Sequence, residues 1–215
     1  MHYIKNYDSL ASNENRKVVL QLVEEAFASI TPEQVFTHDF TIADDTLKIQ
    51  DKSFDLSQFD RVFLIGFGKG SALMCKIIEE KILAIEAGIG DKFQGGMVID
   101  VVDQTFQKLA FVKGTHPLPS KENFDFTKKL IDTYSNLTEK DLVLITTCGG
   151  GSVLLEKPHT FSLEDMIAIN SALLDSGATI SEMNAIRKHL SQVKGGSLAK
   201  ILYPATSANL LFSDV

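Results

Sequence analysis

The sequence has little cysteine, no long apolar run and no excess of basic residues, and each absence excludes a class of protein. Its 215 residues include two cysteines, Cys75 and Cys148, which are too few for a disulfide framework or a four-cysteine zinc site. No uncharged apolar segment is long enough to span a membrane, and residues 1–7 lack the apolar core of a signal peptide. We therefore expect an unexported protein of the reducing cytoplasm.

Basic residues are the minority among the charged ones. With 21 Lys and Arg against 28 Asp and Glu, the formal net charge is -7 at pH 7. Such a charge repels polyanions, which argues against nucleic acid or an anionic membrane as the main partner. A small anion can still bind in a local basic pocket. Because 44% of the residues are hydrophobic, the chain can form a buried core, and we expect a folded protein.

The N-terminal region predicts two helices before any strand. Between Asn13 and Ile30, apolar residues recur every three or four positions, which indicates an amphipathic helix with one buried face. That face consists of Val18, Val19, Leu22, Val23, Ala26 and Phe27. Thr31 followed by Pro32 is typical of the start of a short second helix. We expect Thr46–Ile49 to form an edge strand.

From Arg61 onward the sequence alternates predicted strands and helices. The apolar run Arg61–Gly66 predicts a strand buried on both faces. The glycines after it lead into a predicted helix over Ser71–Ala87 and a strand over Gly96–Val102. These three elements form a βαβ unit, whose right-handed crossover places its two strands parallel in one sheet.

The same alternation continues to the end of the chain. The expected elements are a strand at Leu109–Lys113, a helix at Ser120–Tyr134, a strand at Asp141–Thr147, a helix starting at Ser162, at least one helix within Ala178–Ile201 and a strand at Ala208–Phe212. We therefore predict an α/β fold, with a mainly parallel, doubly wound Rossmann-like sheet and helices on both faces. No linker or repeat interrupts residues 1–215, so we expect one continuous domain.

A first glycine-rich loop, Gly66–Ser71, follows the predicted strand at the position where open parallel sheets bind ligands. It is not a Walker loop, because Phe63 stands where that motif needs glycine, and it is not a dinucleotide fingerprint, because Ser71 stands where that motif needs glycine or alanine. Glycines beside Lys69 at a helix N-terminus favour an anion site. A tight turn without a ligand is the alternative.

A second glycine-rich loop, Thr147–Ser152, also follows a predicted strand. Three successive glycines cost backbone entropy when they become ordered, and a simple turn rarely needs so many. This favours a nest of amides around a phosphate, with a flexible surface connection as the alternative. Ser152 is not expected to be a nucleophile, since Leu154 occupies the glycine position of a nucleophile elbow.

Two further segments carry basic or titratable side chains. Residues 184–196 contain four such side chains and a closing glycine pair: Arg187, Lys188, His189, Lys194, Gly195 and Gly196. They fit an anion site or a solvated helix face equally well, and their spacing does not decide between the two. His116 lies in a proline-rich turn after a predicted strand, and a lone histidine in such a place is more often structural than functional.

These four segments, in this order, resemble the glycerate 2-kinase family, whose second half carries a MOFRL domain. The family's motifs are Gly-x-Gly-Lys after the first strand, Gly-x-His-Pro-x-Pro, Ser-Gly-Gly-Gly-Ser-Ala-Leu-Leu and Asn-x-Val-Arg-Lys-His-Leu-Ser-x-Ile-Lys-Gly-Gly. The last is the most specific, and here it is matched by Asn184, by residues 187–191 and by residues 194–196. The resemblance extends to Val215, with Cys148 in place of the usual serine.

The resemblance implies transfer of the γ-phosphoryl group of ATP, with Mg²⁺, to the 2-hydroxyl of D-glycerate, which gives 2-phosphoglycerate. It makes Lys69 the residue that stabilises the transferring group and Asp214 a candidate catalytic carboxylate. Glu182 and Asn184 are further groups available to a metal or to the substrate hydroxyl, and no metal ligand is assigned. The implied substrate- and phosphate-binding residues are Gly68, His116, Gly149, Gly150, Gly151, Ser152, Asn184, Arg187, Lys194 and Gly195. Phosphoryl transfer relies on positioned cations and amides, which agrees with these residue types.

The resemblance also predicts that the chain is incomplete. Residues 213–215 resemble the start of a family segment that continues into the second domain, so we expect residues 1–215 to be the N-terminal α/β domain without the C-terminal MOFRL-type domain. Two alternatives stay open, namely a half that binds nucleotide or anion without catalysis until it meets a second chain, and a hydroxypyruvate reductase. We expect the loops around Lys69, Gly150 and Gly195 to converge on one cleft at the carboxyl edge of the sheet.

Overall fold

The computed structural model describes residues 2–85 and 88–212 and divides the chain into two compact units, Met1–Phe54 and Asp55–Val215. The sequence predicts one continuous domain because it contains no linker. The structure instead places the boundary between the units inside the strand Lys52–Asp55. A boundary within regular structure leaves no Pro-rich or Ser-rich signature, which explains why composition does not reveal it.

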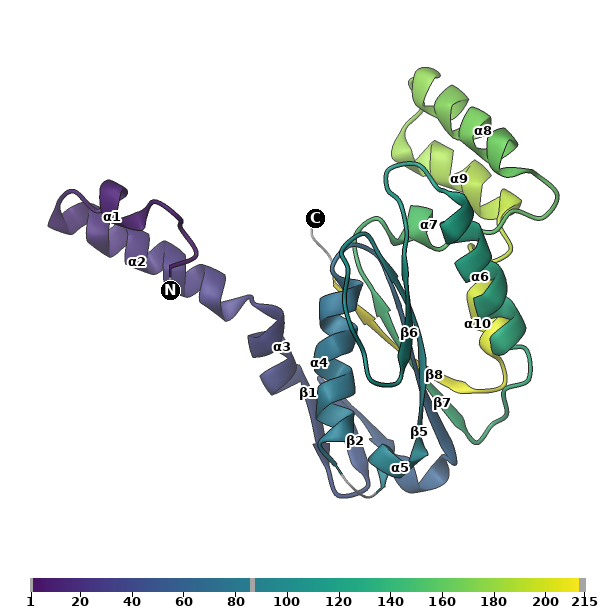
Figure 1. Cartoon of the computed structure of the whole chain (residues 1–215), viewed down its shortest axis with the longest axis horizontal. Coiled ribbons are helices and arrows are strands. Elements are labelled where there is room, and N and C mark those ends of the chain that lie inside the picture. The colour runs from purple at the N-terminus through teal and green to yellow at the C-terminus, as the bar shows by residue number, and fades with distance from the viewer. Residues whose placement is uncertain (1, 86–87, 213–215) are drawn as a thin grey trace. The chain divides into compact units, whose positions relative to one another are not determined.

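The first unit contains helices followed by a small sheet (Figure 1). Its elements are α1 (Tyr7–Leu10), α2 (Glu14–Ser29), α3 (Pro32–Asp39), β1 (Phe40–Ala43), β2 (Thr46–Ile49) and β3 (Lys52–Asp55). The helix predicted after Thr31 is confirmed, with Pro32 as its first residue. The strand Thr46–Ile49 is confirmed as well, but it is β2, the central strand of the order β1-β2-β3 rather than an edge.

The apolar face predicted for α2 is present but is not buried. The helix begins at Asn13, whose Oδ1 accepts a hydrogen bond from the amide of Arg16 at 3.0 Å, as an N-cap residue should. However, Val19 is 59% exposed and Leu22 is 66% exposed, and no residue of α2 is buried. The burial predicted for this face is therefore wrong. Periodicity identifies which face of a helix is apolar, but it does not identify what covers that face.

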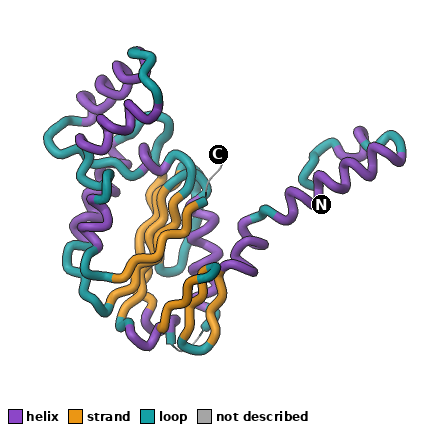
Figure 2. The backbone as a smooth tube through the Cα atoms, turned by 180° about the vertical axis from the view of Figure 1, so that it is seen from behind, coloured by secondary structure: helices purple, strands orange, loops and turns teal. Residues whose placement is uncertain are grey.

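The second unit is built on a five-stranded parallel sheet, seen as adjacent orange strands in Figure 2. The strands are β4 (Arg61–Phe67), β5 (Phe93–Asp100), β6 (Leu109–Lys113), β7 (Asp141–Thr147) and β8 (Thr206–Leu211), in the order β6-β5-β4-β7-β8. All four neighbouring pairs are parallel. The α/β fold class predicted from the sequence is confirmed.

Helices cover both faces of this sheet (Figure 1). The helices of the second unit are α4 (Ser71–Leu83), α5 (Ile89–Lys92), α6 (Lys121–Thr133), α7 (Gly151–Leu154), α8 (Leu163–Asp175), α9 (Ile180–Leu190) and α10 (Ser197–Leu202), with a 3-10 turn at Leu56–Gln58. α4 lies on one face, and α6 and α10 lie on the other. The predicted helix over Ser71–Ala87 ends earlier, at Leu83, and residues 86 and 87 lie outside the described residues.

Several other predicted boundaries also shift by a few residues. The strand predicted at Gly96–Val102 is Phe93–Asp100, and the last strand starts at Thr206 rather than Ala208. The region Ala178–Ile201 holds two helices, α9 and α10. The helix predicted from Ser162 is confirmed with its capping box, in which the Ser162 side chain accepts from the Asp165 amide. Hydrophobic patterning locates elements better than their ends, because terminal residues are half-exposed.

The strand order creates a switch point beside β4. The chain runs from β4 outward to β5 and β6 on one side, then crosses back to β7 and β8 on the other side of β4. In open α/β sheets, ligands bind at the carboxyl ends of the two strands that flank such a point. The two glycine-rich loops follow β4 and β7, so the topology places both of them at this position.

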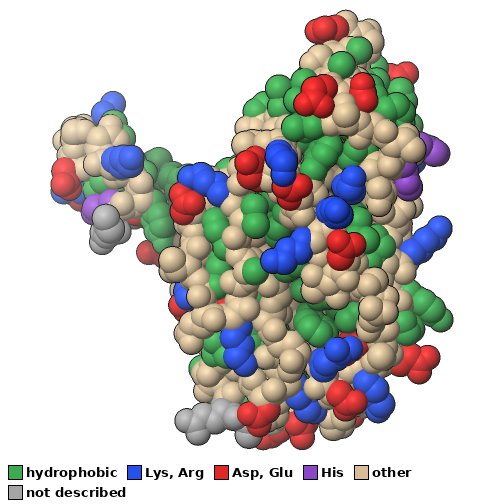
Figure 3. Space-filling view, turned by 45° about the vertical axis from the view of Figure 1, so that its right-hand side comes forward, with side chains coloured by type: hydrophobic (Ala, Val, Ile, Leu, Met, Phe, Trp, Pro, Cys, Tyr) green, Lys and Arg blue, Asp and Glu red, His purple; other side chains and the backbone are tan. Residues whose placement is uncertain are grey.

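No helix among the described residues is both long and apolar enough to cross a membrane. On the face shown in Figure 3, Lys and Arg side chains are interspersed with Asp and Glu side chains over the residues described there. Such mixing does not produce the basic stripe that is typical of nucleic-acid binding.

Candidate functional site

The loops after β4 and β7 are joined by two backbone hydrogen bonds. The amide of Lys69 donates to the carbonyl oxygen of Gly149 at 2.7 Å, and the amide of Cys148 donates to the carbonyl oxygen of Phe67 at 3.0 Å. Gly68 has a φ of +114°, and a Cβ placed on it would lie 2.4 Å from the carbonyl oxygen of Cys148. Glycine is therefore required at position 68 for the two loops to approach this closely.

Lys69 and His116 both lie close to Gly150. A Cβ on Gly150 would lie 3.0 Å from His116 Nε2 and 3.2 Å from Lys69 Cε. Both side chains are exposed at the carboxyl edge of the sheet. The structure thus brings three predicted site residues, from three different loops, to one place. Partial desolvation and then the positive charge of Lys69 lower the pKa of His116 below its ordinary value, which favours the neutral imidazole.

The loop that carries His116 is held by a buried asparagine. Asn123 Oδ1 accepts from the amide of Thr115 at 2.9 Å, and its Nδ2 donates to the carbonyl oxygens of Thr115 at 3.0 Å and Val153 at 3.1 Å. Asn123 is fully buried. Val153 belongs to α7, which begins at Gly151, the last of the three glycines. These bonds tie the histidine loop to the glycine loop. The sequence analysis did not single out Asn123, since one asparagine on a helix carries no pattern.

A buried carboxylate that sequence reasoning missed occupies the N-terminus of α4. Asp100, 1% exposed, accepts hydrogen bonds through Oδ2 from the amides of Gly70 and Ala72, each at 2.9 Å. These are the amides that a helix N-terminus would otherwise offer to a ligand anion. The anion-binding capacity of the first loop therefore depends on the side chain of Lys69. An acidic residue at the end of a strand beside a glycine loop is a signal that could have indicated this contact.

The second loop leaves amides available. Among the described residues, the amides of Gly149, Gly150 and Ser152 have no hydrogen-bond acceptor, whereas the amide of Gly151 donates to the carbonyl oxygen of Cys148 at 3.1 Å. Gly150 has a φ of +75°, which turns successive amides toward one side. Such a concave run of free amides binds anions. The role of this loop in binding phosphate stays a prediction.

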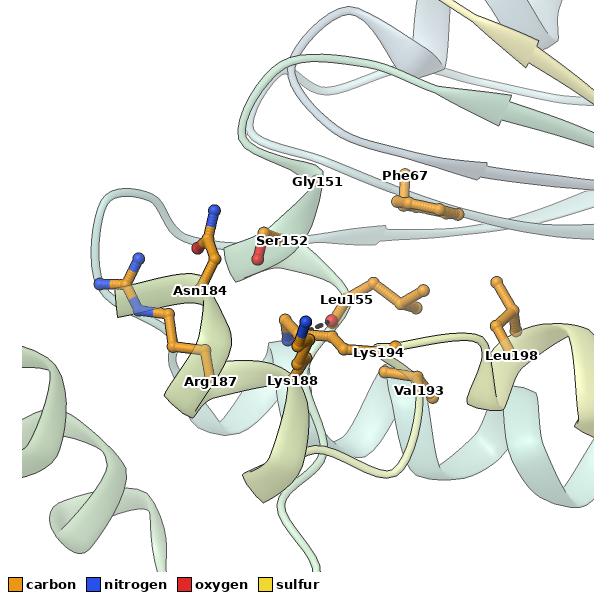
Figure 4. Close-up of a pocket in the computed structure, with 11 residues that line it drawn as sticks. Phe67, Gly151, Ser152, Leu155, Asn184, Arg187, Lys188, Val193, Lys194 and Leu198 are labelled. Carbon is orange, nitrogen blue, oxygen red and sulfur yellow. Dashed lines mark hydrogen bonds between the residues drawn. The ribbon is translucent and has the colours of Figure 1, made fainter. Parts of the chain in front are cut away.

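A pocket of about 310 Å³ lies beside this loop and contains most of the remaining predicted residues (Figure 4). Its wall includes Gly151, Ser152, Asn184, Arg187, Lys194 and Gly195, with Phe67 and Leu198 as apolar members. Figure 4 shows Asn184 and Arg187 projecting from α9, with Ser152 on the facing segment. The loop around Gly195 therefore converges with the glycine loop after β7, as expected. The pocket is large enough for a small organic acid.

The charge of Lys194 is already compensated within the protein. Its side chain is 14% exposed and pairs with Glu156, which is 5% exposed, through a short contact between Nζ and Oε2. Nζ also donates to the carbonyl oxygen of Leu155 at 3.2 Å. Burial lowers the pKa of Lys194, Glu156 opposes this effect, and the charge of Arg187 adds to it. Lys194 thus lines the pocket as half of an ion pair rather than as a free cation.

Arg187 is the better placed cation of this pocket. Its Nε donates to Asn170 Oδ1 at 2.8 Å, which orients the guanidinium. Within the part of the chain that the structure describes, no carboxylate lies within ion-pair distance of it. Its terminal nitrogens can therefore receive a carboxylate or phosphate of a ligand.

Two other predicted groups are Glu182 and Asp214, of which Glu182 does not line this pocket. Glu182 caps α9, since its Oε2 accepts from the amide and the hydroxyl of Thr179 at 2.8 Å each. Asp214 lies outside the described residues. Among the residues that are described, no group of three or more His, Cys, Asp or Glu side chains could hold a metal ion.

Residues 18–215 match the family model described as "Domain of unknown function (DUF4147)". The chain belongs to this family. It is 33% identical over 201 residues to a glycerate 2-kinase from Pyrococcus horikoshii and 37% identical over 160 residues to a D-glycerate 2-kinase from Thermotoga maritima. These matches cover 93% and 73% of this chain, and the resemblance to glycerate 2-kinases inferred from the motifs is confirmed.

Solved structures agree with the sequence relatives. A crystal structure of a Pyrococcus horikoshii protein matches with a TM-score of 0.77 and 30% identity over 95% of this chain, and that of a glycerate kinase from Thermotoga maritima matches with a TM-score of 0.75 over 93%. The chain covers 45% and 44% of those two chains and 43% and 37% of the two sequence relatives. It therefore spans less than half the length of these relatives.

Proposed function

We propose that this chain supplies the phosphate-binding half of an ATP-dependent glycerate 2-kinase. The observation that carries the proposal is the junction of the two glycine loops at the switch point of the sheet, where Lys69 and His116 lie close to Gly150. A cation, a neutral imidazole and free amides at one position suit a phosphate chain. The names of the relatives supply the reaction class, and the site supplies the chemistry that such a reaction needs.

The reaction would proceed without a covalent intermediate. The 2-hydroxyl oxygen of D-glycerate attacks the γ-phosphorus, the bond from that phosphorus to the bridging oxygen of ADP breaks, and the hydroxyl proton is released. Charge accumulates on the phosphoryl oxygens during this step. Lys69 stabilises that charge, and the amides of Gly149, Gly150 and Ser152 hold the phosphates in place.

The acid would bind in the adjoining pocket. Arg187 has free terminal nitrogens and an orientation set by Asn170, so it can hold the carboxylate of the acid in a bidentate manner. Asn184 and Ser152 line the same pocket and supply neutral polar contacts. The basic segment of residues 184–196 is thereby assigned to ligand binding rather than to a solvated helix face.

Magnesium is part of the proposal only as the ion that accompanies ATP. Among the described residues no three His, Cys, Asp or Glu side chains are grouped, and the buried carboxylates of Asp100 and Glu156 are engaged by amides and by Lys194, so the phosphates of ATP and water would supply most of the ligands of this ion. We therefore derive no step through the metal. We also propose that the protein acts in the cytoplasm and that the remainder of the catalytic cleft comes from a second domain or chain, in line with the greater length of the relatives.

A reductase function has less support. Two relatives from Agrobacterium vitis, each 37% identical over 158 residues, are named putative hydroxypyruvate reductases. A dinucleotide site needs an acidic side chain that is free to bind a ribose hydroxyl. The carboxylate at the end of β5, Asp100, is instead buried and bonded to the amides of Gly70 and Ala72. Oxidation of NADH by hydroxypyruvate in the presence of the chain would favour the reductase function over the kinase function.

The proposal is tested by titrating the isotope-labelled chain with ATP and following its amide resonances. We expect saturable shifts at Lys69 and at residues 149–152, and a weaker interaction after Lys69→Met. Lys128→Met, which removes an exposed lysine from α6, is the matched control and should bind ATP like the wild type. Absence of shifts at both glycine loops would contradict the proposal. With ATP, Mg²⁺ and D-glycerate together, we expect this chain alone to form little or no 2-phosphoglycerate, because half a cleft leaves the phosphates exposed to water.

A further inference from the structure

One oxygen of a buried carboxylate has no partner in the structure. Glu156 is 4% exposed, and its Oε2 pairs with Lys194 Nζ. Its other oxygen, Oε1, is buried and has no hydrogen-bond partner among the described residues. Leaving a charged acceptor unsatisfied in the interior is costly, and buried polar atoms without partners are rare in folded proteins.

A small polar cavity adjoins this carboxylate. It has a volume of about 20 Å³ and is lined by Pro119, Ser152, Val153, Glu156, Asn170 and Arg187. That volume suffices for one water molecule or for one hydroxyl group of a ligand. Ser152 and Arg187 line this cavity and also the larger pocket, so the small cavity and the proposed acid site have two wall residues in common.

The backbone around Glu156 is fixed, so the side chain cannot turn to solvent by a loop movement. The amide of Gln192 donates to the carbonyl oxygen of Lys157 at 2.7 Å. The amide of His159 donates to the carbonyl oxygen of Leu190 at 3.0 Å. Gln192 Nε2 also donates to the carbonyl oxygen of Pro158 at 2.7 Å. These bonds clamp the segment after α7 to the segment after α9, which holds Glu156 beside both the cavity and Lys194.

We infer that Glu156 is a specificity-determining residue, whose Oε1 accepts a hydrogen bond from a hydroxyl group of the bound acid. This inference rests on the proposed hydroxy-acid substrate. A carboxylate can only accept hydrogen bonds, so it selects a donor, and a cavity of this size admits a single hydroxyl. Lys69 lines neither the cavity nor the pocket, so the group bound by Glu156 is not the one that receives the phosphoryl group. For D-glycerate, it is the terminal 3-hydroxyl.

The test compares binding of D-glycerate with binding of D-lactate, which has a methyl group in place of the terminal hydroxymethyl group. We expect the wild-type chain to bind D-glycerate more tightly by about tenfold or more, because a site built for a donor is left with an unpaired carboxylate oxygen when the hydroxyl is missing. In Glu156→Gln, the side-chain amide oxygen should accept the hydrogen bond from Lys194. The amide nitrogen, which is a hydrogen-bond donor, then faces the cavity and cannot accept from the hydroxyl group of the acid. The preference should then fall to less than about threefold, while affinity for D-lactate should stay near that of the wild type.

The controls separate this role from folding and from the proposed function. Glu139→Gln removes an exposed carboxylate elsewhere and should keep the preference, and unchanged D-lactate binding by Glu156→Gln would show that the variant is folded. If the wild type bound the two acids equally, the cavity would hold only water and the inference would be wrong, with the proposed acid site intact. A preference retained in Glu156→Gln would also overturn it. If the wild type bound neither acid, the proposed substrate would fail, and this inference with it.

Discussion

The amide of Lys69 lies 2.7 Å from the carbonyl oxygen of Gly149 and donates a hydrogen bond to it. These residues are far apart in the sequence, and each belongs to a loop that follows a central strand of the sheet. Their bond locks the cation and the glycine nest into one rigid feature. The position of the Lys69 backbone relative to the second loop is therefore set by the fold.

The close contact of the two loops should not tolerate a side chain at position 68. Gly68→Ala would place a Cβ 2.4 Å from the carbonyl oxygen of Cys148 at a φ of +114°. We expect a loss of about 2–4 kcal/mol in the free energy of unfolding, from the unfavourable φ and the clash together. Urea unfolding measures this loss.

Gly177→Ala is the matched control for that substitution. Gly177 also has a positive φ, +72°, but a Cβ there would meet nothing within 4 Å. Gly177→Ala should lower the free energy of unfolding by only about 1 kcal/mol, which is the cost of a positive φ for alanine. Equal losses for the two variants would show that the loop contact contributes no additional constraint.

The proximity of Lys69 and His116 should be visible in the titration of the histidine. Burial and then the charge of Lys69 hold the pKa of His116 below the ordinary value of 6.5. Lys69→Met removes the second cause, so the pKa of His116 should rise while staying below 6.5 because burial persists. Histidine NMR resonances followed from pH 4 to 8 report it, and Lys128→Met should leave the value unchanged. A pKa that does not move in Lys69→Met would place the two side chains apart.

The role proposed for Lys69 predicts a specific kinetic change. In a polypeptide with the full length of the relatives, Lys69→Ala should lower kcat by about a hundredfold or more and change KM for D-glycerate little, because the lysine meets charge that develops in the transition state. Lys69→Arg should not restore full activity, since a planar guanidinium does not reproduce a compact ammonium. An unchanged kcat with a raised KM would reassign Lys69 to ground-state binding.

Acid stability should depend on an ion pair between buried Asp141 and half-exposed Arg61 at the opposite, amino end of the sheet. Asp141, fully buried, accepts two hydrogen bonds of 2.6 Å from Arg61. Burial raises the pKa of Asp141, but the bonds from Arg61 and Thr138 outweigh this effect and hold the pKa below its usual range. The resulting stabilisation is complete above the ordinary aspartate pKa of about 3.9 and is lost as the pH falls through the lower folded-state value.

Asp141→Asn should therefore destabilise the protein by about 2 kcal/mol at pH 7, because a neutral amide cannot replace the two charge-assisted hydrogen bonds from Arg61. The difference from the wild type in the free energy of unfolding should narrow in acid, below about pH 4. Asp125→Asn, in the exposed pair with Lys121, is the control and should cost no more than about 1 kcal/mol. A constant difference between Asp141→Asn and the wild type from pH 7 to 3 would argue against a depressed pKa.

Local patterns in the sequence were sufficient to predict the alternation of strands and helices and the positions of the two glycine-rich loops. The apolar run at Arg61–Gly66 and the glycines after it define a strand, a turn and a helix, since each depends on backbone preference and on burial of the residue itself. The motif residues 184–196 were identified in the same way. These features are encoded within short windows, and the structure confirms them with shifted ends.

The partners of charged groups were decided by the tertiary structure alone. Asp100 engages the amides of α4 and Glu156 engages Lys194, although each carboxylate is some thirty residues or more from its partner in the sequence. The tertiary structure alone also decides that the apolar face of α2 is exposed and that β7 pairs with β4. Spacing along the chain specifies which groups a segment offers, whereas the packing of the strands and helices determines which groups meet. The sequence by itself therefore determined the loops and the chemistry they carry. Only the fold decided that Lys194 pairs with Glu156, whereas Lys69 has no ion-pair partner among residues 2–85 and 88–212.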